Sequence, residues 1–275
     1  MSQKTFTDKL NAQWLMKRFL MIGLDPDFSR LPISVTMNVS PEEAVFNFNK
    51  AIIDATHDLV LGYKAQNAFY EALGEAGHRA LKRTSDYLKT TYPDLVTMLD
   101  AKRADIANSN AGYVTSAFEE LGYDAITIHP YLGKEAVQPF LDCADRGIFV
   151  LVRTSNPGAA EFQDLIVDGE PLYMRVAKNV AATWNENGNC GVVVGATYPN
   201  ELSDVRNAVG EMPILIPGVG AQGGDARKAY TLGKNSRGEG VIISVARSVI
   251  FASADDNFAD AARNATRVVV DAIGV

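Results

Sequence analysis

The sequence predicts a single (β/α)8 TIM barrel, an α/β fold that spans residues 1–275 as one domain. Eight short runs rich in aliphatic and β-branched residues recur along the chain, and segments with helical periodicity lie between most of them. Strands that alternate with helices form a parallel sheet with crossover connections. Eight such repeats fit a closed barrel better than an open doubly wound sheet, which opens with a glycine-rich fingerprint. No G-x-G-x-x-G pattern follows the first run.

The predicted elements follow one another in a regular order. Four strands lie near residues 19–25, 58–64, 95–102 and 124–130, and four more begin near residues 147, 190, 213 and 240. A helix is predicted to begin after Ser40, because Pro41 suits the first helical position and Glu43 stands three residues after the serine cap. The longest connection, residues 156–189, has apolar side chains at helical spacing, so we expect helices there and no linker: Leu172, Val176, Val180 and Trp184.

The composition excludes several classes of protein. A net charge of −7 and a pI near 5.1 disfavour binding to nucleic acid or to a membrane surface, because both repel an acidic protein without a basic patch. Cys143 and Cys190 match no metal or redox spacing, which favours a reducing cytoplasm. The N-terminus has no apolar signal segment, and no apolar run approaches the roughly 18 residues of a membrane span, so we expect a soluble, untargeted protein.

Charged residues stand where several predicted strands end, and catalytic side chains of this barrel come from the carboxyl ends of its strands. In LVTMLDAKRAD, the strand period of two places Asp100 and Lys102 on one face, and Asp105 follows three residues later. Asp25 ends the first predicted strand and Lys64 ends the second. Such charges are costly to desolvate unless they pair, so we expect alternating ammonium and carboxylate groups at the barrel mouth.

Each of these residues alone also has a purely structural interpretation. Asp105 could cap a helix, Lys64 could be a rim lysine that reaches solvent, and Asp25 could be a turn residue. Asp100 and Lys102 together are different, because two charges that face a barrel interior are a poor structural choice and a frequent catalytic one. We therefore predict that Asp100 and Lys102 are catalytic, whereas for Lys64, Asp105 or Asp25 taken singly the structural interpretation is slightly favoured.

The loops after the seventh and eighth strands predict a phosphate site, since these loops are the usual phosphate site of this barrel. Residues 217–225 are glycine-rich and are expected to offer close backbone approach and free N–H groups, while an arginine follows the eighth strand. Each signal is weak alone, but at these two places together they favour phosphate. The residues expected at this site are Pro217, Gly218, Gly220, Gln222, Ala246 and Arg247.

Other polar residues carry weaker signals. Ser155 lies in the turn RTSNPG after the fifth strand, where its hydroxyl could bind a polar heterocycle or simply serve the turn. His57, His78 and His129 are scattered, and the first two fall in helical segments, so we interpret them as surface or structural residues. No metal site is predicted from their spacing.

Taken together, these residues give the chain a family resemblance. The chain resembles the orotidine 5′-monophosphate decarboxylases, in particular the longer bacterial-type group, over about residues 23–251. The most specific element is D-x-K-x-x-D-I, formed by Asp100, Lys102, Asp105 and Ile106, and GLDPD, GYKAQNAFYE, TSNPG and PGVGAQGGD occur in the family's order. The resemblance implies an enzyme without cofactor or metal that converts orotidine 5′-monophosphate to uridine 5′-monophosphate and carbon dioxide in pyrimidine biosynthesis.

The resemblance also implies how the substrate would be held. Asp25 and Lys64 would bind the ribose hydroxyls, and Ser155 would contact the pyrimidine. Gln222 and Arg247 would hold the phosphate.

A homodimer with shared active sites is a further implication. Asp105, Ile106 and Ser109 would cross the interface to complete the neighbour's site. Four positions depart from the family's usual pattern and concern this segment: Ala104 and Ala107 replace frequent glycines, Ser109 replaces threonine, and Asn110 replaces alanine.

The resemblance implies a catalytic set of Lys64, Asp100, Lys102 and Asp105. The implied mechanism assigns the central role to Lys102, as the cation and proton donor at carbon 6 of the pyrimidine. Two alternatives remain. A hexulose-phosphate-type lyase or decarboxylase shares the D-x-K-x-x-D strand and normally needs magnesium, but TSNPG and the phosphate loop speak against it. A barrel that only binds nucleotides would be expected to lack one of Asp100, Lys102 or Asp105, and all three are present.

Overall fold

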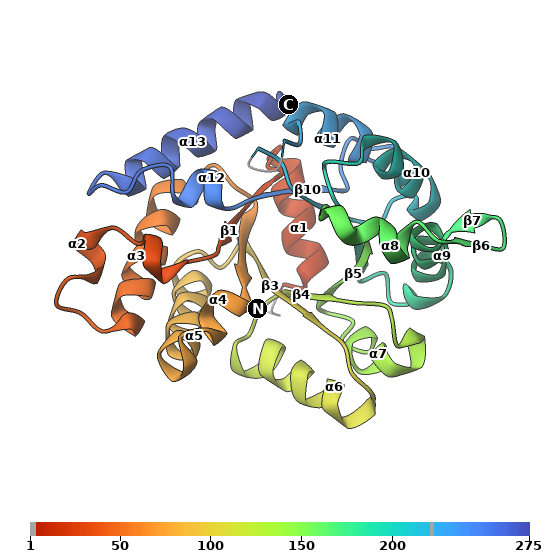
Figure 1. The fold of residues 1–275 in the computed structure, drawn as a ribbon, viewed down its shortest axis with the longest axis horizontal. Helices are drawn as coiled ribbons and strands as arrows, with labels where there is room; N and C mark the ends of the chain where they lie inside the picture. Colours follow the sequence, from red (N-terminus) through yellow and green to blue (C-terminus); the bar gives the residue numbers. More distant parts are fainter. Residues whose placement is uncertain (1–3, 221–222) are drawn as a thin grey trace.

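The computed structural model describes residues 4–220 and 223–275. Within these ranges, eight parallel strands close into a barrel in the order β1-β10-β9-β8-β5-β4-β3-β2, which confirms the predicted fold (Figure 1). Every residue of β1, β4, β8 and β10 is buried, as expected for strands with helices outside and side chains inside. The barrel strands are β1 (Leu20–Leu24), β2 (Gly62–Gln66), β3 (Val96–Arg103), β4 (Ala125–Ile128), β5 (Gly147–Arg153), β8 (Cys190–Val194), β9 (Ile214–Pro217) and β10 (Val241–Val245).

Helices surround the barrel on its outside, as Figure 1 shows. The α-helices are α1 (Phe6–Leu15), α2 (Ile33–Thr36), α3 (Pro41–Thr56), α4 (Asn67–Glu71), α5 (Gly74–Thr91), α6 (Ala107–Val114), α7 (Gly133–Leu141), α8 (Ala160–Gln163), α9 (Leu172–Asn179), α10 (Pro199–Val209), α11 (Ala226–Gly233), α12 (Arg247–Ile250) and α13 (Phe258–Ile273). Short 3-10 turns are η1 (Phe28–Arg30) and η3 (Pro157–Ala159), and π-helical turns are η2 (Thr115–Glu120) and η4 (Val180–Trp184). Ser40 caps α3 as predicted, since its hydroxyl accepts a hydrogen bond from the Glu43 N–H at 3.2 Å.

The second barrel strand begins later than the sequence predicts. Residues 57–59 still form the turn that follows α3, and sheet pairing starts with the N–H of Leu61, which donates to the carbonyl of Leu20 at 2.8 Å. β2 therefore covers residues 62–66 and not the predicted 58–64. As a result Lys64 lies in the middle of its strand and not at the strand's end.

The long connection contains the predicted helices and one element that we did not predict. Its apolar residues at helical spacing form α9 and η4. Ahead of them, β6 (Ile166–Val167) pairs with β7 (Glu170–Pro171) in an antiparallel hairpin that projects away from the barrel in Figure 1. Asp168 and Gly169 at its tip both have positive φ, 52° and 85°, which is the pattern of the Asp-Gly hairpin turn. The Asp168-Gly169 dipeptide was the feature of the sequence that could have predicted this hairpin.

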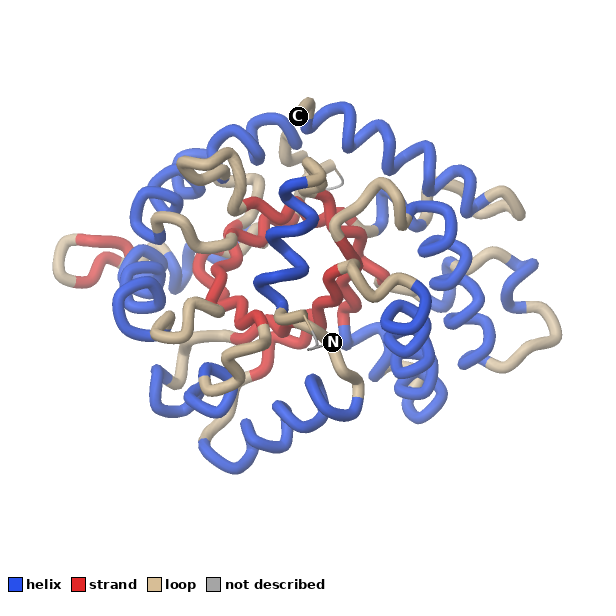
Figure 2. Tube along the Cα trace, turned by 180° about the vertical axis from the view of Figure 1, so that it is seen from behind, coloured by secondary structure: helices blue, strands red, loops and turns tan. Residues whose placement is uncertain are grey.

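The amino end of the barrel is covered by α1. Figure 2, seen from behind, shows this helix lying across the ring of strands. The indole N–H of Trp14 donates to the carbonyl of Val241 at 2.9 Å, and the Phe6 ring packs edge-on against Phe149 with centroids 5.7 Å apart. These contacts hold α1 over the amino end of the barrel. No helix of the described residues is long and apolar enough to cross a membrane.

Candidate active site

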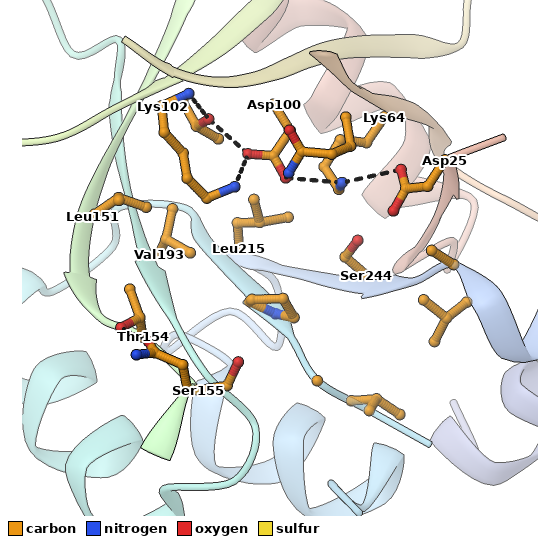
Figure 3. Close-up of a pocket in the computed structure, with 18 of the residues that line it drawn as sticks. Asp25, Lys64, Asp100, Lys102, Leu151, Thr154, Ser155, Val193, Leu215 and Ser244 are labelled. Carbon is orange, nitrogen blue, oxygen red and sulfur yellow. Dashed lines mark hydrogen bonds and ion pairs between the residues drawn. The ribbon is translucent and has the colours of Figure 1, made fainter. Parts of the chain in front are cut away.

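A cavity of about 390 Å³ opens at the carboxyl ends of the barrel strands (Figure 3). The structure brings together nine of the residues that the sequence predicts for the site: Asp25, Lys64, Asp100, Lys102, Ser155, Pro217, Gly218, Ala246 and Arg247. Apolar side chains from the strands form the rest of the wall, among them Leu151, Val193 and Leu215. A polar cluster on an apolar floor is the usual composition of a small-molecule site.

Asp100 is the centre of the charged cluster. Its carboxylate accepts hydrogen bonds from Lys64 Nζ at 2.9 Å and from Lys102 Nζ at 2.6 Å, and Figure 3 shows one ammonium on each side. The Thr127 hydroxyl donates to the same carboxylate at 2.8 Å and the Gln66 amide donates at 3.3 Å. The expected alternation of ammonium and carboxylate groups is therefore present in the cavity.

A bulge in β3 sets the direction of the Lys102 side chain. The register against β4 shifts between Leu99 and Arg103, and Lys102 has a positive φ of 48°, which is uncommon for a residue with a side chain. The Lys102 N–H donates to the Thr127 hydroxyl at 3.0 Å. Beyond the bulge, Arg103 forms an ion pair with Glu71 outside this cavity. The sequence predicts one regular face for Asp100 and Lys102, whereas the structure reaches the same outcome through a distorted strand.

Ion pairing favours the charged forms of Asp100 and Lys64. Burial alone would raise the pKa of Asp100, but the ammonium groups of Lys64 and Lys102 outweigh burial and keep that pKa well below its usual range. Burial likewise would lower the pKa of Lys64, and the carboxylates of Asp100 and Asp25 raise it instead. Two ammonium groups therefore flank the carboxylate of Asp100, and one of them, that of Lys64, also faces the carboxylate of Asp25.

Asp25 is the least satisfied carboxylate of the site. Its Oδ1 lies 3.7 Å from Lys64 Nζ, and this buried oxygen has no hydrogen-bond partner among the described residues. Burial raises the pKa of Asp25, and Lys64 offsets only part of that rise. A buried acceptor without a donor is costly, so the geometry suits a ligand that brings a hydroxyl or N–H to this oxygen.

The glycine-rich loop lies beside the start of α12 as expected, but it is less open than the sequence suggests. Gly218 and Gly220 have φ values of 95° and 75°, where a side chain would strain the backbone. The N–H groups of Gly220, Gly223 and Gly224 donate to carbonyls within the loop, so the expectation that the loop's N–H groups are free is wrong for these three. Gly220 does not line the cavity, and Gln222 lies outside the described residues.

The segment Thr154-Ser155-Asn156 forms the wall opposite the charged cluster, and all three residues line the cavity. Figure 3 shows Ser155 across the cavity from the lysines. Gly195 supports it from behind: a Cβ at Gly195 would lie 2.8 Å from the Cβ of Ser155. Only glycine therefore lets the end of β8 approach this closely.

Asp105, Ile106 and Ser109 do not line the cavity of their own chain. Ile106 is 60% exposed, although it is aliphatic. The suggestion that Asp105 caps a helix is wrong, because Ile106 occupies the cap position of α6 and Asp105 Oδ1 accepts only from the neighbouring Ile106 N–H at 2.7 Å. Asn110, which departs from the family's pattern, is buried and fixes the segment, since its side chain accepts from the Asp105 N–H and donates to the Asp105 carbonyl.

The histidines take no part in this cavity. The His57 ring stacks on Tyr92 with centroids 4.3 Å apart, and His78 lies within α5. The structural interpretation of both residues agrees with these positions. Among the described residues, no three His, Cys, Asp or Glu side chains gather as metal ligands would.

Comparison with known proteins identifies the family. The family model "Orotidine 5'-phosphate decarboxylase / HUMPS family" matches residues 19–262, most of the chain. The chain belongs to this family. Curated orotidine 5′-phosphate decarboxylases of Cellvibrio japonicus and Herpetosiphon aurantiacus are 48% and 49% identical, over 94% and 89% of this chain and 94% and 88% of theirs. The solved orotidine monophosphate decarboxylase of Leishmania donovani has a TM-score of 0.82 and 33% identity, covering 98% of this chain and 99% of its own.

This member of the orotidine 5′-phosphate decarboxylase / HUMPS family also has site residues that the sequence analysis missed. They are the polar side chains Gln66, Thr127, Thr154, Asn156 and Ser244. Gln66 and Ser244 each stand two residues from a predicted site residue, Lys64 and Ala246 respectively. Thr127 is the polar residue within the apolar run AITI. A polar residue inside an otherwise apolar strand was the signal that could have found Thr127.

Proposed function

We propose that this protein decarboxylates orotidine 5′-monophosphate to uridine 5′-monophosphate and carbon dioxide, with Lys102 as the cation and proton donor at carbon 6. One observation carries the proposal: an ionised Asp100 lies between Lys64 and Lys102 in the barrel cavity. Curated relatives that carry this activity in their names cover nearly the whole chain, which supports the assignment of the substrate.

The chemistry explains why a lysine is needed. When the bond between carbon 6 and the carboxylate breaks, its electron pair stays on carbon 6, where the ring offers little delocalisation. An ammonium about 4 Å away stabilises such a charge by roughly 4 kcal/mol at an effective dielectric near 20. The Lys102 ammonium then transfers a proton to carbon 6, a C–H bond forms, and the neutral amine recovers its proton from solvent.

Asp100 prepares Lys102 for this role. Its carboxylate accepts a hydrogen bond from Lys102 Nζ at 2.6 Å, so the proton donor is held in place before the substrate arrives. The same carboxylate stands near the position of the departing carboxylate, and repulsion between the two would favour departure. Prepositioned charge that needs no reorganisation is the largest contribution that such a site makes.

The remaining cavity residues each bind a different part of the substrate. Asp25 and Lys64 bind the ribose hydroxyls, which supplies the donor that Asp25 Oδ1 lacks. Ser155 contacts the pyrimidine from the opposite wall. Arg247 and the loop with Pro217, Gly218 and Gln222 bind the phosphate beside Ala246, and the phosphate's binding energy helps to close the site.

The functional unit is a homodimer with shared sites. Asp105, Ile106 and Ser109 do not line the cavity of their own chain, and the exposed aliphatic side chain of Ile106 suits burial against a second copy. Tyr131, 88% exposed, precedes α7, which packs against α6. We propose that Asp105 reaches the partner's Lys102 and completes its set of carboxylates.

The hexulose-phosphate-type alternative fits less well. A divalent cation needs several carboxylate oxygens free to coordinate it. Here both oxygens of Asp100 already accept from ammonium groups of Lys64 and Lys102, which would repel such an ion. We therefore propose a reaction that requires neither metal nor cofactor.

An ultraviolet assay of orotidine 5′-monophosphate turnover tests the proposal. Lys102→Ala should lower kcat by about a thousandfold or more while the fold is retained, because roughly 4 kcal/mol of charge stabilisation is lost together with the proton donor. Lys50→Ala is the matched control, since it also removes a lysine paired with an aspartate, but on the outside of the barrel. Activity should survive exhaustive chelation. Ordinary activity in Lys102→Ala would contradict the mechanism, and a strict need for added magnesium would favour the hexulose-phosphate-type reaction.

A further inference from the structure

Arg153, the last residue of β5, is buried although it is charged. Arg153 is only 1% exposed. The pairing of β5 with β8 changes register between Leu151, which lines the cavity, and Arg153, which does not. The guanidinium lies 3.9 Å from the centre of the Tyr198 ring and pairs with Asp164 at 3.2 Å. A buried arginine with this many partners fixes the elements that supply them.

Gln163, at the end of α8, connects this arginine to the cavity wall. Its Oε1 accepts from Arg153 Nη1 at 3.3 Å and from the Thr154 N–H at 2.9 Å, while its Nε2 donates to the Thr154 hydroxyl at 2.8 Å. That hydroxyl in turn donates to Asn156 Oδ1 at 2.6 Å. One side-chain amide therefore holds both the backbone and the side chain of Thr154.

Ser155 lies between the two residues that this network holds. Gln163 itself does not line the cavity, whereas Thr154, Ser155 and Asn156 do. With Gly195 packed closely behind Ser155, the segment is fixed from the side of β8 and from the side of α8. Any effect of Gln163 on a bound ligand must pass through this segment.

We infer that Gln163, held by Arg153, is a positioning residue that fixes the Thr154–Asn156 segment so that Ser155 meets the pyrimidine ring. This inference rests on the proposed function for the role of Ser155. The segment follows the end of β5, where the pairing with β8 stops at Arg153, so strand pairing does not hold the segment itself. A loop that must order itself on binding loses affinity and rate, and a misplacement of about 1 Å can cost on the order of a hundredfold in rate.

The test is a double-mutant cycle between Gln163→Ala and Ser155→Ala. Two quantities are measured for each protein: kcat/KM for orotidine 5′-monophosphate and Kd for uridine 5′-monophosphate. Glu161→Ala is the control, because Glu161 is an exposed residue of the same helix. Gln163→Glu is the conservative variant, since its carboxylate keeps both acceptor contacts, and melting temperatures verify that each fold is intact.

We expect Gln163→Ala to lower kcat/KM by about tenfold and to weaken uridine 5′-monophosphate binding, while Glu161→Ala changes neither quantity. Gln163→Glu should recover most of the loss. In the Ser155→Ala background, Gln163→Ala should have less than about a twofold further effect, because residues that act through one contact are not additive.

Different experimental outcomes would contradict this inference and the proposed function. If the single losses multiply in the double variant, or if Gln163→Ala behaves like Glu161→Ala, the inference is wrong and the proposed function stands. If the unaltered protein does not turn over orotidine 5′-monophosphate, the proposed function is wrong, and the binding cycle with uridine 5′-monophosphate still decides whether Gln163 acts through Ser155.

Discussion

The hydroxyl of Thr127 donates to Oδ1 of Asp100 at 2.8 Å, across the boundary between β4 and β3. The same hydroxyl accepts from the backbone N–H of Lys102 at 3.0 Å, in the bulge where the sheet register is interrupted. Thr127 thus fixes the carboxylate and the backbone of the lysine relative to each other. One buried threonine sets a geometry that two charged residues cannot set alone.

Thr127→Val is expected to lower kcat by about tenfold to a hundredfold with little change in fold. A hydrogen bond to a charged group contributes roughly 1.5–3 kcal/mol, and valine removes it without changing the side-chain shape. Steady-state kinetics measure the effect. Thr127→Ser is the control that keeps the hydroxyl, and equal activities of the valine variant and the unaltered protein would show that the bridge has no role.

Because the pKa of Asp25 is raised in the empty site, we expect nucleotide binding to depend on pH. Burial raises the pKa of Asp25, and ribose hydroxyls that donate to its Oδ1 would favour the ionised form and lower that pKa. By linkage, binding should weaken as the pH falls through the pKa of the empty site. Calorimetry with uridine 5′-monophosphate from neutral pH downward measures this, and the ligand's own phosphate titration cancels in a comparison with Asp25→Asn. Parallel pH profiles of the two proteins would contradict the prediction.

The same raised pKa has a consequence for stability. A carboxyl group whose pKa is raised by folding stabilises the fold below its unfolded pKa, and this stabilisation is lost as the pH rises through the folded value. Asp25→Asn should therefore raise the melting temperature of the empty protein at neutral pH. At a pH below both values the two proteins should melt alike, which serves as the internal control.

Arg247→Ala tests the phosphate site. The variant should lose about tenfold to a hundredfold in kcat/KM with orotidine 5′-monophosphate, the usual cost of one charge-assisted hydrogen bond. With orotidine, which has no phosphate, its kcat/KM should match that of the unaltered protein. Equal losses with both substrates would show that Arg247 does not bind the phosphate.

The shared site predicts complementation between inactive subunits. Lys102→Ala and Asp105→Ala homodimers should both be nearly inactive, but a mixed dimer has both defects in one site and leaves the other site intact. Random re-association makes about half of the dimers mixed, so about a quarter of the activity should return. A mixture of Lys102→Ala with Asp100→Ala is the control and should stay inactive, because every mixed dimer then has one defect in each site. If subunit exchange is demonstrated and no activity returns with Asp105→Ala, the interface assignment is wrong.

The sequence was informative wherever the chemistry is local. The period of a strand and the placement of charges at strand ends were sufficient to predict Asp100, Lys102 and Asp25 as neighbours, because parallel strands bring their carboxyl ends to one rim. The position of Lys64 within β2 was wrong by two residues, since a helix-to-strand turn has no sharp signal in the sequence. The error did not affect the predicted site, because moving the end of the strand by two residues leaves Lys64 on the same face of β2.

Contacts between distant strands could not be predicted in this way. Thr127 and Gln66 reach Asp100 only because β3 lies between β2 and β4, and no local pattern reveals which polar side chains share a carboxylate. The bulge that orients Lys102 contains no glycine or proline from which it could have been predicted. The role of residues 105–109 stays a prediction, because it concerns a second copy of the chain.

The charged cluster takes one residue or more from each of four adjacent strands or strand ends, from β1 to β4. It therefore does not exist in any intermediate in which one of these strands is unpaired or out of register, however much helix that intermediate contains. During refolding, the return of catalysis should lag behind the far-ultraviolet circular dichroism signal and coincide with closure of the ring. The recovery of activity, followed by substrate absorbance, therefore reports the time at which the barrel closes.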